Sequence, residues 1–198
     1  MSKKDSWKHV FCIEGLWDSD LRSTITIKPG LDLLQTNGLK YIYKDAATKE
    51  ELKFYLKKFK QKRYSNYPIL YLGFHGKEQL IELSNGDFSI DELGQILQGA
   101  CKNKVIILAS CSTLNTTDKG IEAFREITQA LAVIGYKSDV DWFEATAFEI
   151  MLIDVLYHNA FDGRGLKGIV KKFKELNKRF PKIGATIHPN PKATPSKN

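Results

Sequence analysis

A cysteine and a histidine each stand at the end of a short apolar run, and together these two residue types can carry out nucleophilic catalysis. Cys111 lies within Val-Ile-Ile-Leu-Ala-Ser-Cys-Ser-Thr at 105–113, and His75 follows Pro-Ile-Leu-Tyr-Leu-Gly-Phe at 68–74. An imidazole close to a thiol takes up its proton and leaves the more reactive thiolate. Gly76 follows the histidine and leaves a backbone N–H open to a substrate carbonyl oxygen. The pattern predicts a thiol–imidazole dyad.

Both apolar runs are typical of strands buried on both faces, as in the middle of a parallel sheet. In open α/β sheets, ligands and catalytic residues lie just past the carboxyl ends of the strands. If the two strands are parallel neighbours, His75 and Cys111 leave the sheet at the same edge, side by side. This shared position strengthens a prediction that neither residue would support alone.

Each residue also has a structural interpretation. A strand-end histidine such as His75 is often a hydrogen-bonded structural residue, and Cys111 can be a small buried apolar side chain. Ser110, Ser112 and Thr113 are alternative nucleophiles, but no Gly-x-Ser-x-Gly turn surrounds them. The sequence has no Gly-x-Gly-x-x-Gly or Walker-type loop, so no nucleotide cofactor is indicated.

The cysteine content argues against disulfides and bound zinc. The three cysteines, at positions 12, 101 and 111, form no Cys-x-x-Cys pair, so we expect neither a disulfide framework nor a metal site. Cys12 lies inside an apolar run and is expected to pack in the core. A reducing cytoplasm suits a free thiol, so we expect a cytoplasmic protein. We also expect that the protein needs no cofactor.

The composition is that of one ordinary folded domain. The chain has 198 residues, of which 42% are hydrophobic and 27% are charged, which is enough for a sizeable core. No apolar run is long enough to span a membrane, and the first residues lack the apolar stretch of a signal peptide. We therefore expect no membrane interaction.

The formal charge of +7 leaves room for an acidic partner. Much of the excess lies in two groups on amphipathic segments: Lys53, Lys57, Lys58, Lys60, Lys62 and Arg63, and Lys167, Lys171, Lys172, Lys174, Lys178, Arg179 and Lys182. Our interpretation is that both groups form solvated outer helix faces. Nucleic-acid binding is the alternative, and it has no motif behind it.

Periodicity and turn residues predict a single domain at 1–188 and a disordered proline-rich tail at 189–198. Strands are expected at 9–14, 39–43, 68–74, 105–109, 130–135 and 183–188. Helices are expected at 29–37, 48–63, 89–99, 120–129 and 141–158, with a hairpin arm at 79–83 before Asn85-Gly86. A last helix is expected after a chain break at 162–165 and should end near Phe180. This order predicts an α/β fold with a mostly parallel sheet.

Three segments together resemble the CHAT branch of the caspase-like cysteine peptidases. They are the His-Gly ending at Gly76, the Ser-Cys-x-Thr at 110–113, and Ala-Val-Ile-Gly at 132–135 with the following aspartates and the alanine-containing helix around 145–148. The similarity covers roughly residues 68 to 160. It implies a three-layer caspase-like sandwich with helices on both faces of a mostly parallel central sheet.

The resemblance also implies roles for particular residues. His75 would be the general base and Cys111 the nucleophile of a cysteine endopeptidase, and the backbone N–H groups of Gly76 and Cys111 would hold the oxyanion. The substrate would be a protein or peptide.

Members of this clan select substrates largely by the residue before the scissile bond. Glu14, Asp139 and Asp141 follow strand ends, so a pocket there would be acidic and would favour Lys or Arg. From position alone, Asp139 and Asp141 are equally explained as residues that begin the next helix.

The family analogy suggests a bacterial regulatory or defence protease, with an activating partner protein as a further expected partner. The alternatives are a catalytically silent caspase-like binding or scaffold module and, with less support, a nucleic-acid-binding protein that uses its basic helices.

Overall fold

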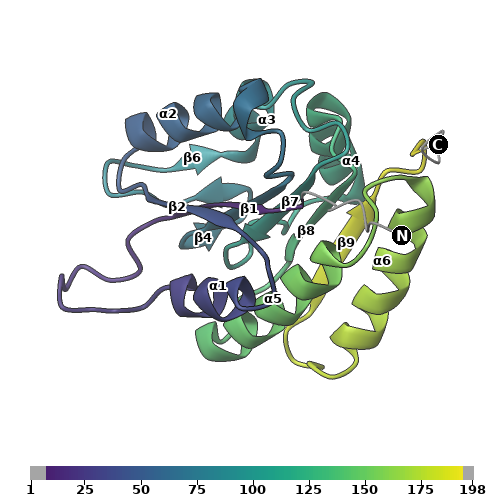
Figure 1. The fold of residues 1–198 in the computed structure, drawn as a ribbon. Coiled ribbons are helices and arrows are strands. Elements are labelled where there is room, and N and C mark those ends of the chain that lie inside the picture. The colour runs from purple at the N-terminus through teal and green to yellow at the C-terminus, as the bar shows by residue number, and fades with distance from the viewer. Residues whose placement is uncertain (1–7, 194–198) are drawn as a thin grey trace.

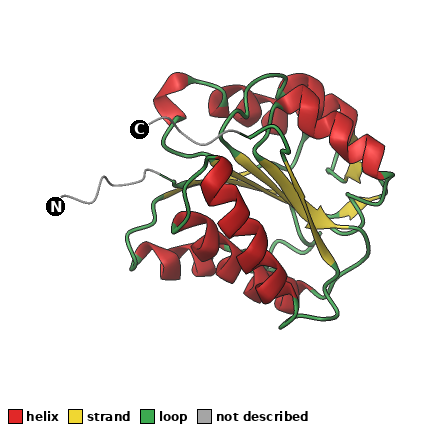
Figure 2. Cartoon of the chain, turned by 90° about the vertical axis from the view of Figure 1, so that its right-hand side faces the viewer, coloured by secondary structure: helices red, strands yellow, loops and turns green. Residues whose placement is uncertain are grey.

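The computed structural model describes residues 8–193 and shows a central sheet between two layers of helices (Figures 1 and 2). Six strands lie in the order β2-β1-β3-β7-β8-β9, and all neighbours are parallel except β8 and β9. The strands are β1 (Val10–Glu14), β2 (Tyr41–Asp45), β3 (Ile69–Gly73), β7 (Val105–Ala109), β8 (Ala132–Tyr136) and β9 (Ala185–Pro189). The predicted α/β class and mostly parallel sheet are confirmed.

The helices form two layers, one on each face of the sheet, as Figure 1 shows. One layer contains α1 (Lys28–Gln35), α5 (Trp142–Tyr157) and α6 (Gly163–Asn177). The other contains α2 (Lys49–Phe59), α3 (Ile90–Ile96) and α4 (Asp118–Thr128), with a 3₁₀ turn at Lys62–Tyr64 after α2. This is the expected three-layer sandwich.

The apolar strand runs are explained by burial on both faces. In β3, Ile69 and Tyr71 contribute to the core under α1, α5 and α6, while Leu70 and Leu72 contribute to the core under α2, α3 and α4. All five residues of β1, β3, β7 and β8 are buried. Alternate side chains point to opposite faces, so a strand between two cores must be apolar throughout.

Side-chain caps set where the helices begin. Thr48 with Glu51 forms the predicted capping box of α2, and Ser89 with Glu92 forms that of α3. The α4 helix begins two residues before its predicted start at Gly120, because the Thr117 hydroxyl accepts the Gly120 N–H.

Other boundaries differ from the predictions by a few residues. The predicted helix 48–63 stops at Phe59, because Gln61 adopts an extended conformation with ψ of 140°. The second strand begins at Tyr41 rather than Leu39, whose buried side chain packs in the core before the strand starts. The last helix ends at Asn177, three residues before Phe180. It begins at Gly163, inside the predicted break at 162–165, because the Asp162 side chain accepts the N–H groups of Arg164 and Gly165 and caps the first turn.

The predicted hairpin belongs to a separate three-stranded antiparallel sheet that begins directly after His75. Its strands are β4 (Gly76–Lys77), β5 (Leu80–Ile81) and β6 (Phe88–Ser89). Asn85-Gly86 lies in the longer connection between β5 and β6, where Gly86 has a φ of 117°. The Asn85 side chain accepts the Lys49 N–H, so this turn lies against the beginning of α2.

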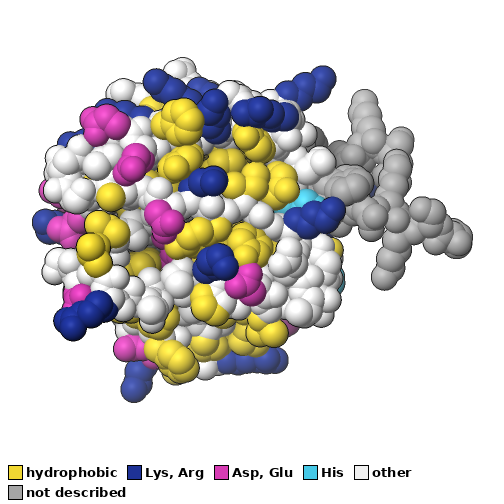
Figure 3. All heavy atoms as spheres, turned by 60° about the vertical axis from the view of Figure 1, so that its left-hand side comes forward, with side chains coloured by type: hydrophobic (Ala, Val, Ile, Leu, Met, Phe, Trp, Pro, Cys, Tyr) yellow, Lys and Arg dark blue, Asp and Glu magenta, His cyan; other side chains and the backbone are white. Residues whose placement is uncertain are grey.

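The two basic groups lie on opposite outer layers, since one belongs to α2 and the segment after it and the other to α6 and the segment after it. They therefore do not form one continuous surface. On the face drawn in Figure 3, basic side chains are interspersed with acidic and apolar ones. These findings agree with solvated helix faces.

Within residues 8–193, no helix is both long and apolar enough to cross a membrane. Of the predicted disordered tail, Pro189 forms the end of β9, and residues 194–198 lie outside the described part of the chain. Residues 1–7 of the predicted domain also lie outside it.

Candidate active site

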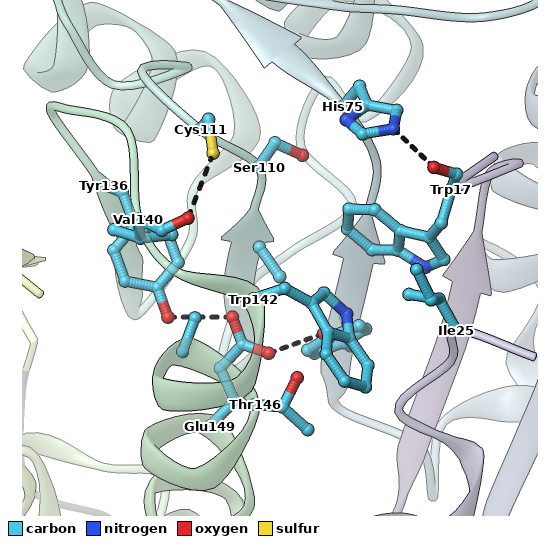
Figure 4. A pocket seen from close by; sticks show the side chains of 13 residues that line it. Trp17, Ile25, His75, Ser110, Cys111, Tyr136, Val140, Trp142, Thr146 and Glu149 are labelled. Atoms are coloured by element: carbon cyan, nitrogen blue, oxygen red, sulfur yellow. Dashed lines mark hydrogen bonds between the residues drawn. The ribbon is translucent and has the colours of Figure 1, made fainter.

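The structure brings His75 and Cys111 to equivalent positions on neighbouring strands. In the parallel pair β3 and β7, Gly73 lies opposite Ala109, and each candidate residue follows two positions later. Both side chains line one cavity of about 150 Å³ (Figure 4). The predicted adjacency at the carboxyl edge of the sheet is therefore present.

Gly76 holds the histidine segment close against the cysteine turn. A Cβ atom at this position would lie 2.6 Å from the Cys111 carbonyl oxygen, 2.9 Å from the Ser110 Cβ, and closer still to the Thr113 hydroxyl. These distances are too short for real contacts, and one of the atoms belongs to the backbone. Glycine is therefore required for the two segments to approach this closely.

Replacing Gly76 by alanine is expected to lower the free energy of unfolding by roughly 1–3 kcal/mol, the usual cost of overpacking. Urea denaturation measures the change. Gly168→Ala is the matched control, because Gly168 lies inside α6 and the nearest atom to an added Cβ is Asn159 Oδ1, at 3.1 Å. The added Cβ need displace only this one side-chain atom, so the helical substitution should change stability by less than about 1 kcal/mol in either direction. Equal stability of the Gly76→Ala variant and the unsubstituted protein would contradict the close approach.

A backbone carbonyl fixes the His75 ring. His75 Nε2 lies 2.8 Å from the Trp17 carbonyl oxygen, and the Trp17 ring meets the imidazole edge-on with centroids 5.4 Å apart. A carbonyl only accepts, so Nε2 carries the proton and Nδ1 is the basic nitrogen of the neutral ring. In Figure 4, Nδ1 is on the side of the ring toward Cys111.

The cysteine turn has a conformation that is costly for a residue other than glycine. Ser112, directly after Cys111, has a φ of 53°, in the left-handed region. The Ser112 hydroxyl donates to Asp139 at 2.8 Å, and the Ser112 N–H donates to the Ser138 carbonyl at 3.2 Å. The segment after β8 therefore holds the turn in this shape, and a held unfavourable conformation is common at functional sites.

Of the three cysteines, Cys111 is the one with an exposed surface. Cys12 and Cys101 are buried. Burial raises the pKa of the Cys12 thiol well above its usual value and raises that of Cys101 to about 12. The Cys111 thiol is half-buried and lies 3.9 Å from the Val140 carbonyl oxygen. Reactivity toward solutes is therefore confined to Cys111.

The structure does not place the three predicted pocket carboxylates around the cavity. Glu14 is 1% exposed and points into the loop after β1, where it accepts hydrogen bonds from Trp17 Nε1 at 2.9 Å and from the Thr26 hydroxyl at 2.5 Å. Asp139 binds Ser112, and Asp141 caps α5 by accepting the Glu144 N–H at 2.9 Å. All three carboxylates position the backbone around the site.

The carboxylate that does line the cavity is Glu149, on α5, which the sequence predictions missed. It is 4% exposed and accepts hydrogen bonds from the Tyr71 hydroxyl at 2.7 Å and the Tyr136 hydroxyl at 2.8 Å (Figure 4). Burial raises the pKa of Glu149 to about 7, although both tyrosine hydroxyls act in the opposite direction. The sequence signal that could have identified Glu149 is its position next to Phe148, on the buried side of a strongly apolar helix.

Aromatic rings and one unpaired hydroxyl make up much of the remaining cavity wall. The aromatic lining residues are Trp17, Tyr71, Tyr136 and Trp142. Ser110, between the two candidate catalytic residues in Figure 4, is 2% exposed, and its hydroxyl has no hydrogen-bond partner. A buried hydroxyl without a partner costs free energy, and a bound substrate group could satisfy it.

Among residues 8–193, no group of three or more His, Cys, Asp or Glu side chains could hold a metal ion. At the cavity, the described residues include an imidazole, a thiol and a buried carboxylic acid.

Comparison with known proteins gives a family without an assigned activity. No curated protein matches the chain. The model of a family of unknown function, DUF6642, matches residues 7–179, which is well over half of the chain. The protein therefore belongs to the DUF6642 family.

Proposed function

We propose that the protein is a cysteine endopeptidase of the caspase-like CHAT type, with Cys111 as the nucleophile and His75 as the general base. The observation that carries the proposal is the pairing of the two side chains at matched strand ends, on one cavity, with His75 Nε2 bound to a backbone carbonyl. The motifs at 70–76 and 105–113 that resemble CHAT domains contribute these same two residues.

The reaction begins when the Cys111 side chain turns from the Val140 carbonyl toward His75, whose Nδ1 takes the thiol proton. The thiolate sulfur bonds to the carbonyl carbon of the substrate, and the carbonyl π electrons move to oxygen. Backbone N–H groups of Gly76 and Cys111 stabilise this oxyanion. The carbon–nitrogen bond then breaks as the imidazolium gives its proton to the leaving amine.

A thioester between Cys111 and the substrate remains. Water attacks it while His75 takes a proton from the water, and the thiolate leaves as the carboxylic acid product forms. His75 returns the proton to sulfur, so the enzyme is regenerated without any cofactor. A reducing cytoplasm keeps the Cys111 thiol available for this cycle, and an activating partner protein and a regulatory or defence role in bacteria are part of the same proposal.

Labelling with iodoacetamide and cleavage of a peptide library test the proposal. The unsubstituted protein should be alkylated at Cys111 at neutral pH and should cut peptides, whereas Cys111→Ala should lose both activities. Cys101→Ala is the control and should retain both, because this buried thiol lies outside the cavity. If Cys111 reacts no faster than a denatured thiol and no peptide is cut, the domain is a silent binding module and the proposal fails.

A further inference from the structure

We infer that the cavity beside the dyad binds the Lys or Arg side chain that precedes the scissile bond, and that Glu149 recognises its positive charge. This inference deepens the proposed peptidase function and rests on it for the placement of the scissile bond. It assigns the recognition of basic residues to a carboxylate on α5 in place of Glu14, Asp139 and Asp141.

Glu149 is a buried acid without a cationic partner among the described residues. Within the described residues 8–193, its hydrogen bonds come from two tyrosine hydroxyls and it takes part in no salt bridge. Buried carboxylates are usually paired with a cation. A basic substrate side chain would supply the missing partner.

The Glu149 carboxylate keeps acceptor positions that the tyrosine hydroxyls do not use. Each Glu149 oxygen accepts one tyrosine hydroxyl, whereas an ionised carboxylate offers about four acceptor positions. The acceptor positions that remain can take an ammonium or guanidinium group. Tyr71 and Tyr136 come from β3 and β8, so two different strands hold the carboxylate in place.

The walls of the cavity suit the apolar stem of a basic side chain. Trp17 and Trp142 line the cavity, and the hydrocarbon stem of Lys or Arg packs well against such rings. A volume of about 150 Å³ is roughly ten times the minimum space that one water molecule needs, so the cavity has room for more than a single solvent molecule. The unpaired Ser110 hydroxyl at this wall can accept a further hydrogen bond from the substrate.

The charged and titratable groups around Glu149 leave room for a positive charge. The titratable groups that act on it or lie against it are Tyr71 on β3, Tyr136 on β8, and Cys12 and Glu14 on β1. None of these groups is a cation. With its pKa raised to about 7, Glu149 is partly protonated at neutral pH, and a bound cation would favour its charged form.

The sign of the pH dependence follows from this linkage. Recognition of a cation needs the ionised carboxylate, so the preference for a basic residue should rise with pH through about 7 and level off above it. Between pH 6 and pH 8 the ionised fraction of such a group rises about tenfold. His75 and Cys111 affect charged and neutral substrates alike, so a ratio of two substrates isolates Glu149.

The experiment compares two peptides that differ at one residue, arginine in one and its neutral analogue citrulline in the other. For the unsubstituted protein, the ratio of their kcat/KM values should favour arginine and should increase about tenfold from pH 6 to pH 8. Glu149→Gln should abolish both the preference and its pH dependence while the citrulline peptide is still cut. Glu144→Gln, on the same helix but outside the cavity, should behave as the unsubstituted protein.

A binding measurement separates this inference from the proposed function. Butylguanidinium should bind the unsubstituted protein more tightly at pH 8 than at pH 6 by calorimetry, and Glu149→Gln should bind it at least tenfold more weakly at pH 8. Cleavage of both peptides without an arginine preference would overturn the inference and leave the peptidase proposal standing. Pronounced, Glu149-dependent butylguanidinium binding without any cleavage would overturn the peptidase proposal and leave the cation site standing. Binding that depends neither on pH nor on Glu149 would overturn the inference.

Discussion

Replacing His75 by alanine is expected to lower kcat/KM for peptide cleavage roughly a thousandfold, within the usual range for loss of a general base. The reason is the fixed tautomer, because the Trp17 carbonyl holds the proton on Nε2 and leaves Nδ1 as the base for Cys111. Without the imidazole, the thiol must ionise unaided, and the leaving amine loses its proton donor.

The pH dependence of alkylation distinguishes loss of the base from loss of structure. Cys111 should be alkylated faster at neutral pH in the unsubstituted protein than in His75→Ala, where no imidazole takes up the thiol proton. His158→Ala is the matched control, because His158 is an exposed histidine that follows α5 and lies 3.3 Å from Asp154. Identical alkylation profiles for His75→Ala and the control would show that His75 does not activate the cysteine.

The sheet and the dyad positions could be predicted because they depend on short-range patterns. A strand between two cores must be apolar at every position, so β3 and β7 are visible as continuous apolar runs. Residues just past such runs lie at the carboxyl edge of the sheet. This position predicts that His75 and Cys111 lie together. The capping boxes of α2 and α3 are equally local, since each needs only two side chains three residues apart.

The lining of the cavity could not be predicted, because it depends on contacts between distant parts of the chain. Glu149 binds Tyr71, which precedes it by 78 residues, and nothing local indicates that α5 crosses the sheet beside β3. The sequence favours Glu14, Asp139 and Asp141 as pocket residues, because these carboxylates are close to the ends of strands. Their positions at the edge were correct, but their side chains satisfy nearby backbone and loop donors and do not reach the cavity.

The second large effect is expected for Glu14, which holds the loop that orients His75. Its two oxygens accept from Trp17 Nε1, the Thr26 hydroxyl and the Ile27 N–H, the last at 3.2 and 3.3 Å. All the partners are donors, so both carboxylate oxygens are needed as acceptors. Trp17 in turn supplies the carbonyl that binds His75. Glu14 is therefore a positioning residue that acts through the Trp17 loop.

Glu14→Gln replaces one acceptor oxygen with an amino group that faces donors. We expect the free energy of unfolding to fall by roughly 2–4 kcal/mol, because buried hydrogen bonds to a charged group are lost and donors are left unpaired. Urea denaturation measures this loss. Glu122→Gln, on the exposed face of α4, is the control and should change stability by less than about 0.5 kcal/mol.

A readout at the dyad separates positioning from stability alone. Under conditions where both variants are folded, Cys111 in Glu14→Gln should be alkylated more slowly than in Glu122→Gln, and its pH profile should shift toward that of His75→Ala. This follows because a displaced Trp17 carbonyl no longer fixes the proton on Nε2, so Nδ1 is less often the free base. An unchanged pH profile in a destabilised Glu14→Gln variant would show that Glu14 supports the fold without orienting His75.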